Sequence, residues 1–283
     1  MTDRQVPPPP EAATSPPAAT PSPAAAPPPG PSSPPPPGTP PTGRVPWTWL
    51  EAVAAFAIAT GATLLIALPI AAVAGAAGLS LEAMNAALIP LTPIAIGLTT
   101  IAVVGLRHPG SLRRLLGWRP ASRGDWLVGL GVGIAGYLVI GLGLGALMQL
   151  AISAAGAEVP VVQETFRQAA ADEGTAWILV VSAVVLAPIA EELLYRGMLF
   201  QALAKRLGTG WGIWLSAAAF GVTHAAIGAP WLANALLVAV ILPLGALLAW
   251  AFHRRGTLLV PILGHAAFNA INATLLIAAP DVA

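Results

Sequence analysis

Residues 177–196 read WILVVSAVVLAPIAEELLYR, an apolar run that ends in a cluster of charged side chains. Its first part is apolar enough to lie in lipid, yet Glu191, Glu192 and Arg196 follow directly. Charges within a bilayer are costly unless they pair or face a polar cavity, so such a cluster indicates a functional site. Glu192 and Arg196 are four apart and can pair on one helix face, with Glu191 about 100° further round. An ion-paired helix end at the membrane surface is the alternative.

The composition of the whole chain supports a membrane protein. Of 283 residues, 56% are hydrophobic and 9% charged, whereas soluble domains carry roughly 25% charged residues. The net charge of +1 comes with no basic stripe, which argues against nucleic-acid binding. The chain has no Cys, so disulfides, thiolate metal ligands and cysteine nucleophiles are excluded.

Apolar stretches long enough to cross a bilayer recur along the chain. A helix needs about 20 apolar residues to span the hydrocarbon core. The sequence predicts an all-α, polytopic bundle of about seven transmembrane helices: Trp47–Leu79, Met84–Leu106, Trp126–Ala154, Thr175–Leu203, Trp211–Ile227, Leu232–Phe252 and Thr257–Ala279.

The charges of the connecting loops predict the orientation of these spans. Cationic residues gather in the second, fourth and sixth loops: Arg107, Arg113, Arg114, Arg119, Arg123, Lys205, Arg206, Arg254 and Arg255. The third loop is acidic on balance. Because cytoplasmic loops are enriched in Lys and Arg, we expect the N-terminus in the cytoplasm and the C-terminus outside.

The prolines define a separate N-terminal region. Most of them fall in residues 1–45, a Pro/Ala-rich segment that cannot bury enough apolar surface to offset the entropy of ordering. We predict a disordered cytoplasmic tail at 1–45, which could bind a polyproline-recognising partner. The membrane domain then occupies residues 46–283, with its motif-bearing core at about 175–275.

Two histidines interrupt later apolar spans. His224 closes the stretch 217–224, and His265 is followed four residues later by Asn269 on the same predicted helix face. Counted along their helices from the basic loops, Glu191, His224 and His265 fall at similar depths. We therefore predict that the three side chains converge in one pocket within the membrane.

This set of side chains suits hydrolysis. A carboxylate can take a proton from water, an imidazole can orient that water or bind a metal, and imidazole and Asn N–H groups can stabilise an oxyanion. The chain lacks the His-Glu-x-x-His pattern of common zinc proteases. Buried Glu, His and Arg also mark proton relays, so a transporter is a competing hypothesis.

The motifs resemble a known family. Glu191-Glu192-x-x-x-Arg196, Phe220-x-x-x-His224 and His265-x-x-x-Asn269 are similar to the motifs of the CPBP family. That family contains type II CAAX prenyl endopeptidases and bacterial proteins described as abortive-infection or bacteriocin self-immunity proteins. The resemblance implies an all-helical intramembrane endopeptidase, integral to a bacterial plasma membrane, that acts on membrane-associated or CAAX-like peptide or protein substrates.

The resemblance also implies roles for individual residues. Glu191 would be the general base, and Glu192 and Arg196 a supporting pair. His224 would activate water or bind metal, and His265 with Asn269 would complete the site. Glu191, His224 and His265 could together hold a divalent metal such as Zn2+, or act on water directly. Besides the transporter, a non-catalytic membrane scaffold or immunity protein remains an alternative.

Overall fold

The computed structural model describes residues 1–2, 45–79, 81–154, 156, 169–170, 173–225 and 230–278. Apart from the first two, these residues belong to one compact unit, Pro37–Ala283. The predicted disordered tail, with its proposed partner, lies outside the described residues except for positions 1, 2 and 45.

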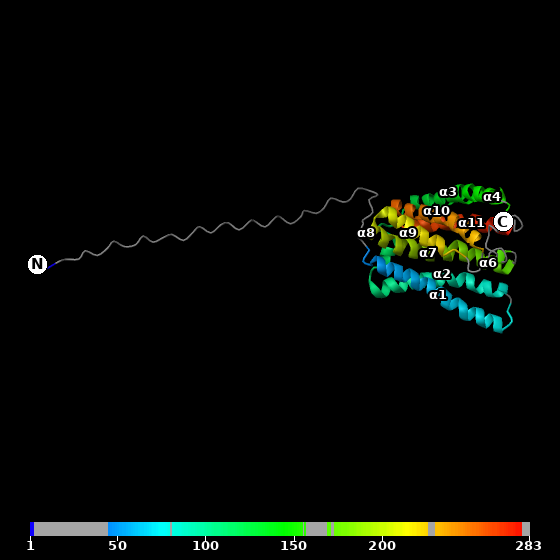
Figure 1. Cartoon of the computed structure of the whole chain (residues 1–283), viewed down its shortest axis with the longest axis horizontal. Helices are drawn as coiled ribbons and strands as arrows, with labels where there is room; N and C mark the ends of the chain where they lie inside the picture. Colours follow the sequence, from blue (N-terminus) through cyan, green and yellow to red (C-terminus); the bar gives the residue numbers. More distant parts are fainter. Residues whose placement is uncertain are drawn as a thin grey trace. The chain divides into compact units, whose positions relative to one another are not determined.

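Helices make up this unit, and no strand occurs among the described residues. The first half contains α1 (Trp49–Ala76), α2 (Leu81–Arg107), the 3-10 helix η1 (Leu112–Leu116), α3 (Arg123–Gly136), the π-helical segment η2 (Tyr137–Leu144) and α4 (Gly145–Ala154). The second half contains α6 (Glu173–Val181), η3 (Ser182–Leu186), α7 (Ala187–Glu192), η4 (Leu193–Phe200), α8 (Gln201–Leu207), α9 (Thr209–Val222), α10 (Trp231–Arg255) and α11 (Leu259–Ala278), with η3 and η4 π-helical. Figure 1 shows the helices of this unit.

The predicted helical membrane bundle is confirmed. Six helices of the described part are long and apolar enough to span a membrane, including the composite helices Arg123–Ala154 and Gly174–Leu207. The fifth predicted span, Trp211–Ile227, is shorter than expected: α9 has 14 residues, or about 21 Å. It therefore ends inside the depth of the bundle, at Val222.

Small residues allow α11 to pack closely on α3. A Cβ on Gly133 would lie 2.7 Å from the Cβ of Ala267 and would also collide with the backbone of Gly264. Without a side chain at Gly133 the two backbones approach each other directly, as small residues permit in membrane helices. This contact fixes the depth and rotation of α11, which carries His265.

A buried carboxylate joins the basic end of the bundle. Asp125, at the start of α3, is fully buried and accepts bonds from Arg119 Nη1 and Nη2 at 2.8 and 2.6 Å and from Arg255 Nη2 at 2.7 Å. Trp118 N also donates to Gly256 O at 3.0 Å. The loop between α2 and α3 is thereby attached to the junction between α10 and α11.

The largest hydrophobic cluster lies between this basic end and the polar motif of the helix that carries Glu191. It includes Trp47, Leu115, Met198, Phe200 and Phe252. Trp47 is fully buried and donates from Nε1 to Met198 O at 3.2 Å. Every residue of η4 is buried. We call the composite helix Gly174–Leu207, which carries Glu191, the motif helix. Packed side chains close the end of this helix that contains η4.

Candidate active site

Three side chains that are far apart in the sequence meet around one oxygen atom. Glu191 Oε2 lies 3.9 Å from His224 Nε2 and 3.9 Å from His265 Nε2. The Glu191 side chain is 13% exposed and that of His224 is 27% exposed, whereas His265 is almost fully buried. Glu191 Oε2 has no hydrogen-bond partner among the described residues. The structure thus brings these three predicted residues together.

Beneath this cluster lies a fully buried ion pair. Arg196 Nη1 donates to Glu192 Oε1 at 2.6 Å, and neither side chain is exposed. Arg196 Nη2 donates to Gly245 O of α10 at 2.9 Å. The guanidinium carbon lies 4.5 Å from the centre of the Phe220 ring, a position in which the ring face attracts a cation. Glu192 and Arg196 thus hold α10 and the motif helix together.

The hydrogen bond at Nδ1 of each imidazole determines whether its Nε2 atom faces Glu191 as a hydrogen-bond donor or as an acceptor. His224 Nδ1 lies 2.7 Å from Phe220 O, and a carbonyl oxygen can only accept, so Nδ1 carries the proton. His265 Nδ1 lies 3.1 Å from Glu192 Oε1, the carboxylate oxygen that also accepts from Arg196 Nη1. Nδ1 of His265 therefore donates as well. In the neutral rings both Nε2 atoms are acceptors, and they face a third acceptor on Glu191.

Three acceptor atoms that face one another favour a guest that brings hydrogens or positive charge. A water molecule has two hydrogens to donate. Because Glu191 Oε2 lies 3.9 Å from each Nε2, the water would lie to one side of the line between two acceptors and bridge them. The geometry therefore suits binding and deprotonation of water.

The backbone of the motif helix departs from the α form on both sides of Glu191. Pro188 has no N–H, so the carbonyl one turn earlier loses its usual helical partner. The adjoining segment Ser182–Leu186 is π-helical, and Leu193–Phe200 is π-helical on the other side of α7. Such wide turns concentrate at functional sites. Here they set the direction in which the two neighbouring carboxylates point.

Aromatic side chains that the sequence analysis did not assign surround the cluster. The Phe220 ring lies 4.6 Å from the ring of His224 and 5.5 Å from that of His265. It also packs edge-on against Tyr195 at 5.0 Å. Phe220 belongs to one of the motifs, but an aromatic residue in an apolar helix gives no further sequence signal. Its position fixes both imidazole planes.

Two predicted site residues lie differently from the expected picture. His224 does not interrupt a helix; it follows α9 in the turn after Val222. Asn269 lies one turn beyond His265, where its Nδ2 donates to Ala183 O of η3 at 2.7 Å. The carboxamide retains a second N–H. Its position ties α11 to the motif helix above the cluster.

The cluster of Glu191, His224 and His265 lies nearer the basic end of the bundle than the number of residues between Arg206 and Glu191 suggests. The Leu115 carbonyl lies against Gly197, and Gly117 pairs with Thr257, so these residues mark one level. Glu191 is about 9 Å along its helix from Gly197. The motif helix continues past this level into α8, and a count from Arg206 includes that extension.

The donor types at the cluster match a metal site, but their spacing is too wide. Two imidazoles and a carboxylate form a familiar catalytic zinc set. Ligands of one tetrahedral zinc are about 3.4 Å apart, whereas Glu191 Oε2 is 3.9 Å from each Nε2. Among the described residues, no three His, Cys, Asp or Glu side chains are placed to hold a metal ion.

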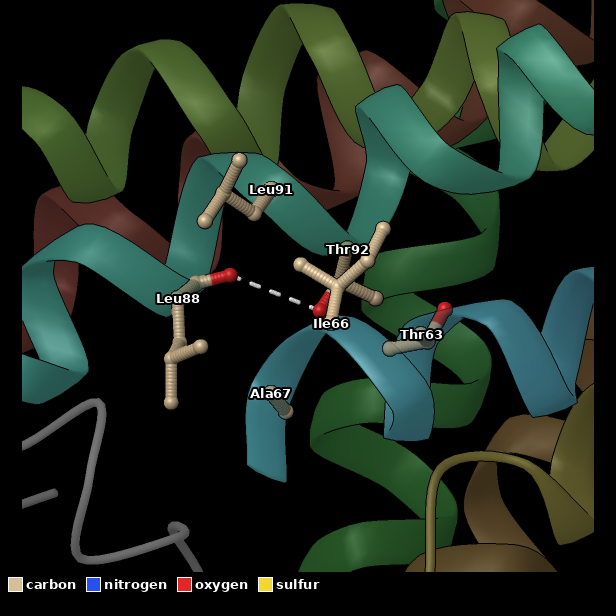
Figure 2. A pocket seen from close by; sticks show the side chains of 6 residues that line it. All are labelled: Thr63, Ile66, Ala67, Leu88, Leu91 and Thr92. Atoms are coloured by element: carbon tan, nitrogen blue, oxygen red, sulfur yellow. Dashed lines mark hydrogen bonds between the residues drawn. The ribbon is translucent and has the colours of Figure 1, made fainter. Parts of the chain in front are cut away.

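A small hollow lies between α1 and α2, away from Glu191, His224 and His265, and Figure 2 shows it. Its threonines bond to their own helices, with Thr63 Oγ1 donating to Ala59 O at 3.1 Å and Thr92 Oγ1 to Leu88 O at 3.4 Å. The other lining groups are aliphatic: Ile66, Ala67, Leu88 and Leu91. No titratable group is among these lining residues, so the hollow offers nothing for hydrolysis.

Comparison with protein families gives one match. Residues 173–271 match the family described as type II CAAX prenyl endopeptidase Rce1-like. The matched segment contains Glu191, Glu192, Arg196, His224 and His265, together with Asn269. Searches of curated proteins and of solved structures found no match.

Proposed function

We propose that this integral membrane protein is an intramembrane endopeptidase that uses water activated by Glu191, because residues 173–271 match the type II CAAX prenyl endopeptidase Rce1-like family. The observation that carries the proposal is the meeting of Glu191 Oε2 with two imidazole Nε2 atoms at 3.9 Å. A carboxylate oxygen without a hydrogen-bond partner in the described chain is free to accept a proton.

In the proposed reaction Glu191 takes a proton from water while His224 Nε2 orients it. The water oxygen forms a bond to the scissile carbonyl carbon, and the carbonyl oxygen takes up the negative charge. When the C–N bond breaks, Glu191 returns its proton to the leaving nitrogen, which gives a carboxylate and an amine. The second N–H of Asn269 is the donor proposed for the oxyanion.

Glu192 and Arg196 support this chemistry without touching the substrate. The Glu192 carboxylate orients His265 through Nδ1 and is itself held by Arg196. This arrangement keeps the His265 Nε2 lone pair directed at Glu191, as a buried carboxylate does for catalytic histidines.

The substrate class follows from the place of the cluster. Glu191 lies among apolar helices, so we propose peptide bonds of membrane-associated segments, with CAAX-like C-termini as the class that the family name suggests. The test compares new peptide termini in membranes from cells with the wild-type protein and with Glu191→Gln. Termini that depend on Glu191 identify substrates, and identical sets of termini in the two membranes would refute the proposed activity.

A further inference from the structure

The loop between α2 and α3, residues 107–123, carries a concentration of positive charge. It contains Arg107, Arg113, Arg114, Arg119 and Arg123 and no acidic residue. We call residues 107–123 the basic loop. A run of four to eight Lys or Arg residues next to a membrane helix is typical of segments that contact anionic lipid.

The acids nearest the basic loop are already engaged. Asp125 is buried and bound by Arg119 and Arg255. Glu51 lies 3.6 Å from Arg107 Nε and 3.2 Å from His108 Nε2. These pairs neutralise part of the positive charge. Arg113 and Arg123 are exposed and make no ion pair within the described part of the chain, so their charge is available to an external anion.

Apolar side chains accompany these arginines. Within η1, Leu112 is 41% exposed and Leu116 is 53% exposed, on either side of Arg113. Trp126, at the start of α3, is 54% exposed. Exposed leucines and a tryptophan beside cations are the composition of a segment that lies in the membrane interface, with its apolar groups among acyl chains and its charges at the headgroups.

The basic loop is a fixed surface. Leu115 is buried, and its carbonyl lies so close to η4 that a Cβ on Gly197 would be only 2.8 Å away. Gln201 Nε2 donates to Arg114 O at 2.9 Å, and Leu258 N donates to Leu116 O at 2.9 Å. These contacts hold η1 against the helix that carries Glu191 and Arg196.

We propose that the basic loop binds the headgroups of anionic phospholipids, with Leu112 and Leu116 inserted between acyl chains and with Arg113 and Arg123 on the phosphates. A soluble acidic protein would match the charge but would leave the leucines in water. The lipid surface matches both features, and the contact of Leu115 with Gly197 places the bound lipid beside the helix that carries Glu191. This proposal stands independently of the proposed proteolytic activity.

The test uses the full-length protein in nanodiscs of phosphatidylcholine that contain a minor fraction of phosphatidylglycerol. Native mass spectrometry after stepwise delipidation counts the phosphatidylglycerol that remains bound. We expect Arg113→Gln/Arg123→Gln to lower the apparent affinity by about fivefold for each arginine removed. The matched control is Arg206→Gln, which removes an exposed charge at the end of α8 and should leave retention unchanged.

Further arms separate the alternatives. If the double variant fails to fold in phosphatidylcholine alone, the single variants Arg113→Gln and Arg113→Lys replace it, and the lysine should keep most of the retention. Equal retention by the wild type and the glutamine variants would overturn the proposal. An equal loss in Arg206→Gln would overturn it in favour of general charge attraction. Displacement of the lipid by inorganic phosphate alone would point to a free-phosphate site and would also overturn it.

Discussion

The Tyr195 hydroxyl lies 2.6 Å from the Thr223 hydroxyl and joins the motif helix to the turn that carries His224. Thr223 Oγ1 lies 3.0 Å from Phe220 O and 3.2 Å from Ala219 O, two backbone carbonyls that can only accept its single hydrogen. The phenol of Tyr195 is therefore the donor in the bond between the two side chains. Tyr195 is buried, whereas Thr223 is exposed, so the bond runs from the core of the bundle to its surface.

Loss of this bond should displace His224 and reduce turnover. We expect Tyr195→Phe and Thr223→Val each to lower kcat by roughly tenfold, because small displacements of catalytic groups are costly. Thr223→Ser, which keeps the hydroxyl, should restore most of it. A double-mutant cycle followed by thermal unfolding in nanodiscs should give a coupling free energy of about 0.6 to 2 kcal/mol. Additive effects of the two substitutions would show that the bond does not position His224.

Glu191→Gln should separate catalysis from folding. Glu191 Oε2 makes no hydrogen bond within the described chain, so the neutral amide of the same shape should leave the midpoint of thermal unfolding within a few degrees of the wild type. Loss of the proton acceptor should lower kcat by about a hundredfold or more. Turnover of an identified substrate and thermal unfolding are measured on the same preparation. Normal turnover in this variant would remove Glu191 from the role of base.

Substitution within the buried ion pair of Glu192 and Arg196, unlike Glu191→Gln, should reduce the stability of the folded protein. Glu192→Gln leaves the Arg196 guanidinium uncompensated at full burial, and breaking one side of such a pair costs about 3 to 5 kcal/mol. We expect a large loss of folded protein in membranes, measured as the detergent-resistant fraction. Glu192→Gln/Arg196→Met removes both charges and should recover folding but not turnover, because His265 then lacks the carboxylate at Nδ1. Full stability in Glu192→Gln alone would contradict the ion-pair assignment.

The sequence predicted the cluster better than its surroundings. Glu191 and His265 were identified because ionisable groups on apolar helices are conspicuous, and helix rise placed them at similar depth. The end of α9 at Val222 and the contact between Leu115 and Gly197 depend on packing between distant segments, which no local pattern encodes. Tyr195 was missed for a different reason: its ring resembles ordinary core, and only the position of Thr223 reveals its hydroxyl as a tether. Pro188 was the one visible signal for the π-helical turns.

Chelation tests the metal alternative. At the spacing of Glu191 Oε2 from each Nε2, 3.9 Å, a tetrahedral ion would require the side chains to move closer. We expect turnover to change less than about twofold after dialysis against a strong chelator, since the proposed chemistry needs only the carboxylate and water. Loss of activity that zinc restores would show instead that Glu191, His224 and His265 act as ligands.

The orientation of the chain can be tested directly because it contains no cysteine. Arg113 is exposed in the basic loop, and the positive-inside rule places that loop in the cytoplasm. We expect Arg113→Cys to resist a membrane-impermeant maleimide in intact cells and to react after permeabilisation. The wild-type protein, which cannot react, is the matched control. Labelling of Arg113→Cys in intact cells would show that the basic loop faces outward and would contradict the predicted orientation.

A reporter that is active only in the cytoplasm, fused after Ala283, tests the other end of the chain and should remain inactive. The bond of Arg255 to Asp125 holds the end of α10 at the level where α3 begins, so α10 returns to the basic side of the bundle. This holds whether the short helix α9 crosses the bilayer fully or only enters it, because α10 reverses the passage in either case. The last helix, α11, then starts on the basic side and crosses once, which leaves the C-terminus outside. An active reporter together with protection of Arg113→Cys in intact cells would therefore show that α11 does not complete its crossing, and would leave the orientation of the basic loop intact.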